Sequence, residues 1–157
     1  MTGKIRFAEE KDIPVILEFI RALARYEKLE HEVVATEEIL REWIFEKGKA
    51  EVLLLSEGET PVGFALFFHN FSTFLGRAGV YLEDLFVLPE YRGKGYGKQL
   101  LKTLAAITVE RGCGRLEWSC LDWNAPSIAF YKSLGAVSMD GWSTYRVTGE
   151  TLNRLAE

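Results

Sequence analysis

The sequence has few residues of the types that build metal centres and disulfide frameworks. It contains two cysteines and two histidines among 157 residues, and Cys113 and Cys120 stand seven positions apart. His31 and His69 are isolated, and there is no Cys-x-x-Cys pair, so we expect neither a zinc site nor a disulfide. Two free thiols favour a reducing compartment, and we expect a cytoplasmic protein.

Long apolar runs and an excess of positive charge are also missing. No run approaches the roughly 18 apolar residues of a membrane-spanning helix, and the opening MTGKIRFAEEKD has no signal-peptide core. The formal net charge of −4 argues against electrostatic capture of nucleic acid. With 48% hydrophobic residues, the chain can bury a core. We therefore expect one domain, residues 1–157, without a membrane or nucleic-acid partner.

The hydrophobic period changes along the chain as it does in proteins that combine helices and strands. Alternating or continuous apolar stretches predict strands, and apolar residues three or four apart predict helices. The predicted strands are 4–8, 51–57, 62–70, 80–88, 115–121, 136–139 and 143–147. The predicted helices are 13–24, 36–44, 95–111, 125–134 and a short one from 149. Thr36 and Asn124 are expected to cap the helices that follow them. This order indicates a mixed α/β sheet.

A glycine-rich loop joins the strand at 80–88 to the helix at 95–111. Gly93, Gly95 and Gly97 alternate in it and would let the backbone approach a ligand closely. The start of a helix offers unpaired N–H groups and a positive dipole end, which bind phosphate oxygens. Arg92 and Lys98 could add positive charge there.

Alternating glycines also occur in three further kinds of loop. A glycine-rich turn without a ligand is possible. The P-loop pattern fails because Gly95, not serine or threonine, follows Lys94. A dinucleotide loop would need a third glycine where Lys98 stands, although Glu117 follows about 20 residues later as that fold requires. A nicotinamide-binding protein is therefore a distant alternative.

Two adjacent carboxylates interrupt the apolar strand at 80–88. In a regular strand Glu83 and Asp84 would point to opposite faces, so helices on both faces would bury at least one of them. A buried carboxylate without a partner is costly. An edge strand or an ion pair would account for them structurally. The functional alternative is a carboxylate that binds or deprotonates an ammonium group.

Two segments resemble the cofactor motifs of one superfamily. Residues 92–97, Arg-Gly-Lys-Gly-Tyr-Gly, resemble the R/Q-x-x-G-x-G/A loop of the GCN5-related N-acetyltransferase (GNAT) superfamily. Residues 124–135 resemble its second cofactor motif. Within it, the chain is similar to the diamine (spermidine/spermine) acetyltransferase family through residues 23–27, 81–84 and 141–142. It resembles most closely the branch that acetylates thialysine, through residues 71–77 and 121–124.

This resemblance implies a fold, a cofactor and an assembly. The fold would be a single α/β domain whose central sheet has six to seven mostly antiparallel strands flanked by helices. The chain would transfer acetyl from acetyl-CoA to a small primary amine in a direct ternary complex and would form a homodimer. A protein lysine or N-terminal acetyltransferase is an alternative, and so is a non-catalytic CoA-binding module.

The resemblance also implies roles for particular residues. Glu83 would be the base and Tyr131 the acid that protonates the departing thiolate, although Tyr131 alone could be a packed aromatic residue. Cofactor contacts would come from Leu85, Phe86, Val87, Arg92, Gly93, Lys94, Gly95, Tyr96, Gly97, Lys98, Asn124, Ala125, Pro126, Ser127 and Tyr131. Substrate contacts would come from Tyr26, Glu27, Glu83, Asp84, Glu117, Trp118, Ser119 and Asp140. No metal ligand is implied.

One departure from the family bears on the substrate. Polyamine acetyltransferases carry an aspartate where Ser72 stands here. A long polycation needs carboxylates spaced along its length, so the loss of one should weaken polyamine binding. We therefore expect a short amine, such as a thialysine-like or lysine-like amino acid, to be preferred over spermine.

Overall fold

The computed structural model describes residues 3–157. The chain divides into two compact units, with the boundary between Ser119 and Cys120. The first unit contains the sheet and most of the helices, and the second contains two short helices joined by an extended segment. No described helix is long and apolar enough to span a membrane.

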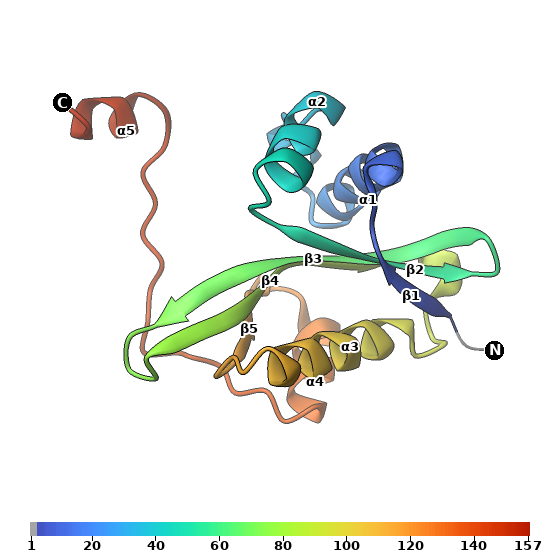
Figure 1. Ribbon diagram of the computed structural model, residues 1–157. Helices are drawn as coiled ribbons and strands as arrows, with labels where there is room; N and C mark the ends of the chain where they lie inside the picture. Colours follow the sequence, from blue (N-terminus) through green and yellow to red (C-terminus); the bar gives the residue numbers. More distant parts are fainter. Residues whose placement is uncertain (1–2) are drawn as a thin grey trace. The chain divides into compact units, whose positions relative to one another are not determined.

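A single five-stranded sheet forms the centre of the first unit (Figure 1). Its strands are β1 (Lys4–Phe7), β2 (Glu51–Glu57), β3 (Thr60–Ser72), β4 (Arg77–Val87) and β5 (Leu116–Trp118). They lie in chain order across the sheet. The first four are antiparallel to their neighbours, whereas β5 runs parallel to β4. The predicted mixed sheet is therefore confirmed, but with five strands rather than six or seven.

Helices cover both faces of this sheet (Figure 1). One face carries α1 (Ile13–Tyr26) and α2 (Glu37–Leu40), which continues as a π-helical segment, Arg41–Glu46. The other face carries α3 (Tyr96–Glu110). Short 3₁₀ turns lie at Glu10–Asp12, Glu30–Glu32 and Pro89–Tyr91. The predicted cap of the second helix is present, since Thr36 Oγ1 accepts a hydrogen bond from Ile39 N at 3.2 Å.

The core under α1 and α2 takes every second residue of the strands, because successive side chains of a strand point to opposite faces of the sheet. Its sheet-side residues are every second residue of β2, Val52 and Leu54, with Phe64 of β3 and Phe86 of β4. Phe19 of α1 stacks on Phe64 with ring centroids 5.5 Å apart. This packing fixes the end of α1, with the predicted site residues Tyr26 and Glu27, relative to β4.

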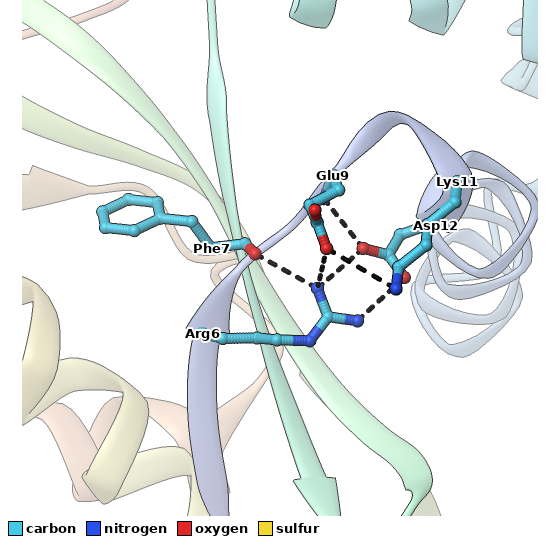
Figure 2. Close-up of polar contacts among 5 residues, drawn as sticks. All are labelled: Arg6, Phe7, Glu9, Lys11 and Asp12. Carbon is cyan, nitrogen blue, oxygen red and sulfur yellow. Dashed lines mark hydrogen bonds and ion pairs between the residues drawn. The ribbon is translucent and has the colours of Figure 1, made fainter.

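An ion pair secures the turn from β1 into α1 (Figure 2). Arg6 Nη1 and Nη2 donate to the two carboxylate oxygens of Asp12 at 2.8 and 2.9 Å. Asp12 also accepts from Glu9 N at 2.8 Å, which caps the first turn. The Arg6 hydrogen bonds lower the pKa of the Asp12 carboxyl, although its burial opposes them.

The second unit contains α4 (Ala125–Ser133) and α5 (Gly149–Leu155). Residues 136–148 between them form no strand, so the predicted strands at 136–139 and 143–147 are wrong. Their apolar side chains are exposed instead, at 80% for Val137, 74% for Trp142 and 93% for Tyr145. An alternating pattern supplies one apolar face, but a strand also needs a neighbour to accept its hydrogen bonds. Within the described chain, these residues have none.

Candidate active site

The glycine loop has an open, uncapped helix start. Gly93 and Gly95 both have φ of 82°, a left-handed conformation that other residues adopt only with strain. Gly95 is the N-cap residue of α3, and no side chain caps this helix. A Cβ atom built on Gly93, Gly95 or Gly97 would meet no atom of the described chain within 4 Å. The first N–H groups of α3 therefore lie beside space that could hold a phosphate group.

An open groove of about 690 Å³ continues from this loop along α3. It is lined by Gly95, Lys98, Gln99, Lys102, Thr103 and Ala106. Lys98 and Lys102 stand one helical turn apart, and neither forms an ion pair with a described residue. The groove therefore presents two positive charges in line with the helix start, which suits an anionic ligand with more than one phosphate group.

Arg92 turns back from the loop toward the sheet. Its Nε donates to the Val87 carbonyl oxygen at 2.8 Å. Its guanidinium group lies over the rings of Tyr26 and Phe86, with centroid distances of 5.0 and 5.3 Å. Arg92 thus connects the loop, the end of β4 and the end of α1, which places it between the predicted cofactor residues and the predicted substrate residue Tyr26.

Beside the loop, β4 contains a β-bulge at Glu83. Leu66 of β3 pairs with Asp84 and Phe67 pairs with Leu82, so Glu83 is an extra residue in β4. The regular alternation assumed from the sequence is therefore wrong at this point. The register places Asp84 opposite Leu66, which packs against the core under α1, while Glu83 is exposed. Bulges of this kind redirect a side chain next to many active sites.

Three carboxylates interact at this bulge. The pKa of Asp84 is raised to about 7, first by burial and then by the charges of Glu83 and Glu27. The pKa of Glu27, directly after α1, is raised by burial and by Glu83. Such a cluster favours the arrival of a cation, which would relieve the mutual repulsion. Among residues 3–157, no group of three His, Cys, Asp or Glu residues has the arrangement of a metal site.

The strands β4 and β5 pair over three residues only. Val80 to Leu82 pair with Leu116 to Trp118, and the pairing ends there. Within residues 3–157, residues 83–87 therefore have no strand partner on the β5 side, although residues 84–87 pair with β3 on the other. The predicted cofactor residues Leu85, Phe86 and Val87 lie on this free edge. Alternate backbone groups of such an edge can bind the amides of an extended ligand.

The predicted residues of β5 interact with their own neighbours. Glu117 accepts from Asn70 Nδ2 at 3.1 Å and pairs with Arg115 at 3.3 Å. Ser119 Oγ forms a hydrogen bond with Tyr81 Oη. Trp118 is partly buried. These contacts hold β5 against β3 and β4, and they do not include Glu27, Glu83 or Asp84.

The remaining predicted residues lie in the second unit. Asn124 is 7% exposed, and its Oδ1 accepts from Ser127 N at 3.3 Å, so the predicted cap of α4 is present. Ala125 and Pro126 form the first turn of this helix. Tyr131 is partly buried on the same helix, its ring 5.6 Å from that of Phe130. Asp140 accepts from Ser138 Oγ in the extended segment.

Sequence reasoning missed one residue at the site. Glu57, the last residue of β2, accepts hydrogen bonds from Lys94 and Tyr96 of the glycine loop. It stands almost forty positions before them and belongs to no motif. In the sequence, Glu57 is a charged residue at the start of a predicted turn, where charged residues are common, so nothing marked it as a site residue.

Comparison with known proteins identifies the family of this chain. Residues 16–136 match the model of the acetyltransferase (GNAT) family. The chain is 38% identical to the mouse thialysine N-epsilon-acetyltransferase, over 98% of this chain and 96% of that one. It is 31% identical to the L-ornithine N5-acetyltransferase of Arabidopsis thaliana, over 99% and 88%.

Among solved structures, an integron cassette protein from the mobile metagenome of V. cholerae is 32% identical with a TM-score of 0.83. The match covers 100% of this chain and 99% of that one. The matched residues include the bulge of β4, the glycine loop and α4. The chain therefore belongs to the acetyltransferase (GNAT) family.

Proposed function

We propose that this N-acetyltransferase transfers acetyl from acetyl-CoA to a primary amine of a short molecule, a thialysine-like or lysine-like amino acid or a diamine. The observation that carries the proposal is the cluster of Glu27, Glu83 and Asp84 beside the free edge of β4. It combines a site for a cation with a strand edge that can hold an extended cofactor. The names of the relatives, which specify thialysine and ornithine, support amines of this size.

The acid cluster would address the main difficulty of amine acetylation. A lysine-like ammonium group with a pKa near 10.4 must lose a proton before its nitrogen can attack, at a cost of about 4.6 kcal/mol at pH 7. Asp84 and Glu27 are the partly buried carboxylates, so they bind the cation. Glu83 is exposed on the bulge and accepts the proton through water. The nitrogen would then attack the thioester carbonyl, so that a C–N bond forms and the C–S bond breaks, and the second proton lost by the nitrogen would balance the one gained by the thiolate sulfur.

The cofactor would lie along the edge of β4 and the start of α3. Residues 85–87 would bind the pantetheine amides, and Gly93 to Lys98 the diphosphate. For the second unit, the resemblance of residues 124–135 to the second cofactor motif supports cofactor contacts from Asn124 to Ser127. We assign to Tyr131 the proton that the departing thiolate needs, because a phenol hydroxyl can donate it or stabilise the charge.

We also propose that residues 1–157 act as one N-acetyltransferase domain, in a cytoplasmic homodimer. The exposed apolar side chains of residues 136–148, including Met139 at 60% and Trp142 at 74%, support association with a second copy. The two free cysteines support a reducing compartment. Light scattering coupled to size-exclusion chromatography should give twice the mass of one chain, and a monomer at micromolar concentration would refute the dimer.

An acetyl-CoA turnover screen tests the proposed function. The acceptors are thialysine, lysine, ornithine, short diamines, spermidine and a histone-type peptide. We expect the highest kcat/KM with a short amine. The best acceptor is then tested with Glu83→Gln and Tyr131→Phe, and with Glu90→Gln as the control because Glu90 is exposed and close in sequence. We expect at least a 100-fold loss for Glu83→Gln and no loss for the control.

Three results would contradict parts of this proposal. A peptide as the best acceptor would identify a protein acetyltransferase. CoA binding without turnover of any amine would identify a non-catalytic CoA-binding module. Unchanged kcat/KM in Glu83→Gln and Tyr131→Phe would refute both catalytic assignments.

A further inference from the structure

The turn between β2 and β3 holds the glycine loop through one carboxylate. Glu57 Oε2 accepts a hydrogen bond from Tyr96 Oη, and Lys94 Nζ lies 3.1 Å from the same oxygen. Tyr96 is 2% exposed, so its hydroxyl depends on a protein partner. These hydrogen bonds lower the pKa of Glu57 and raise the pKa of Tyr96 to about 12. Glu57 therefore stays ionised and Tyr96 stays protonated across the neutral range.

The two loop residues that Glu57 holds stand on either side of Gly95. Gly95 is in the left-handed conformation and starts α3 without a side-chain cap. Glycine loses more backbone entropy on ordering than any other residue, so a loop with three glycines is costly to order. Contacts that fix both neighbours of Gly95 in the free protein remove part of that cost before a ligand arrives.

The same carboxylate also neutralises Lys94. With this lysine paired, the charges left for a phosphate ligand are the N–H groups at the start of α3 and the lysines of the groove, Lys98 and Lys102. The direction of the N–H groups depends on the angle at which α3 leaves Gly95. Tyr96 is the first residue of α3, and its hydrogen bond with Glu57 would restrict this angle.

We propose that Glu57 is a positioning residue for the cofactor: by holding Lys94 and Tyr96 it fixes the glycine loop in the conformation that binds the diphosphate of acetyl-CoA. This inference rests on the proposed function, because it takes acetyl-CoA as the ligand of the loop. Glu57 itself does not touch the reacting atoms. Its removal should raise the KM for acetyl-CoA and leave kcat and the KM for the amine nearly unchanged.

A double-mutant cycle on the full chain tests the proposal. The variants are Glu57→Ala, Tyr96→Phe and the combination, with Glu57→Gln as the conservative change that keeps an acceptor for Tyr96. Glu59→Ala is the matched control, because Glu59 lies in the same turn and forms no ion pair with a described residue. The measurements are the Kd of CoA by calorimetry, the KM of both substrates and the melting temperature.

We expect about a tenfold weaker CoA affinity for each single alanine or phenylalanine variant, equivalent to about 1.4 kcal/mol. Because Tyr96→Phe breaks a contact that Glu57→Ala also breaks, the double variant should be no weaker than Glu57→Ala alone, about tenfold below the wild type and not a hundredfold. Glu57→Gln should recover most of the affinity, and Glu59→Ala should match the wild type.

Wild-type affinity in Glu57→Ala would overturn the inference while leaving the proposed function intact. Multiplying effects in the double variant would also overturn it, because they would show that the two residues act separately. A lower melting temperature with unchanged CoA affinity would identify a purely structural contact. Failure of the wild-type protein to bind CoA would remove the proposed function as well.

Discussion

Asp84 should destabilise the folded protein at neutral pH, and replacing it should therefore stabilise the fold. Burial and the charges of Glu83 and Glu27 raise the pKa of Asp84 from 3.8 to about 7. Between these two values the folded protein keeps a proton that the unfolded chain has released. Stability must then fall as pH rises through this interval, because the unfolded state binds fewer protons.

The size of the effect follows from the pKa shift. Each pKa unit corresponds to 1.36 kcal/mol, so about three units give a cost of about 4 kcal/mol once Asp84 is ionised. Asp84→Asn keeps the size of the side chain and removes the charge. We expect it to be about 2–4 kcal/mol more stable than the wild type at pH 8, and nearly equal to it at pH 4. For a chain of this size, that is a rise in melting temperature of about 4–16 °C at pH 8.

The assay is urea denaturation at pH 4, 6 and 8, with Asp122→Asn as the control because Asp122 is exposed. The difference between Asp84→Asn and the wild type should grow with pH and level off above pH 7. If Asp84 binds the amine as proposed, the same variant should also lose activity. If Asp84→Asn is equally stable or less stable than the wild type at pH 8, the claim that ionisation of Asp84 destabilises the fold is wrong.

Three other predictions concern the loop, the groove and the first turn. Gly97→Ala should stabilise α3 by about 0.5–1 kcal/mol, since its Cβ meets nothing, yet weaken CoA binding by tenfold or more, which thermal unfolding and calorimetry would measure. If the groove holds the 3′-phosphate of CoA, Lys102→Gln should raise the KM of acetyl-CoA more than that of acetyl-dephospho-CoA, which lacks this phosphate. The control Lys49→Gln should change neither KM, and equal effects of Lys102→Gln on both cofactors would place the 3′-phosphate outside the groove. Asp12→Asn should cost about 2–4 kcal/mol at pH 7 because it breaks the bonds to Arg6 and to Glu9 N. The lowered pKa of Asp12 means that this difference should shrink as pH falls below about 4, and a constant difference down to pH 2 would refute the ion pair as its source.

The sequence was sufficient for the parts of the fold that local periodicity determines. The stripe of apolar residues in α1 and the continuous apolar runs of β2 and β3 each extend over only a few residues, so each element can be recognised alone. The caps at Thr36 and Asn124 are also local, since the side chain bonds a backbone N–H three residues ahead. The family prediction, made from the loop at 92–97 and the segment at 124–135, is confirmed by the comparisons.

The features that could not be predicted from the sequence depend on pairing between distant segments. The bulge at Glu83 exists because β3 offers one residue fewer than β4 at this point, and neither strand shows that alone. The hydrogen bonds of Glu57 join residues almost forty positions apart. The prediction of strands at 136–139 and 143–147 was wrong because it relied on a local pattern alone. The pattern was present, but no described strand pairs with these residues.

The bulge of β4 determines where the destabilising carboxylate, Asp84, lies. A regular β4 would turn Glu83 and Asp84 to opposite faces of the sheet, so that each carboxylate would face a different layer. The bulge exposes Glu83 and keeps Asp84 on the buried face beside Glu27, where ionisation is costly. An ammonium group entering this site would release that cost, because it pairs with the carboxylates that repel one another. If the cluster binds the amine as proposed, relief of this repulsion would contribute to the affinity for the amine, and Asp84→Asn should gain stability and lose amine binding together.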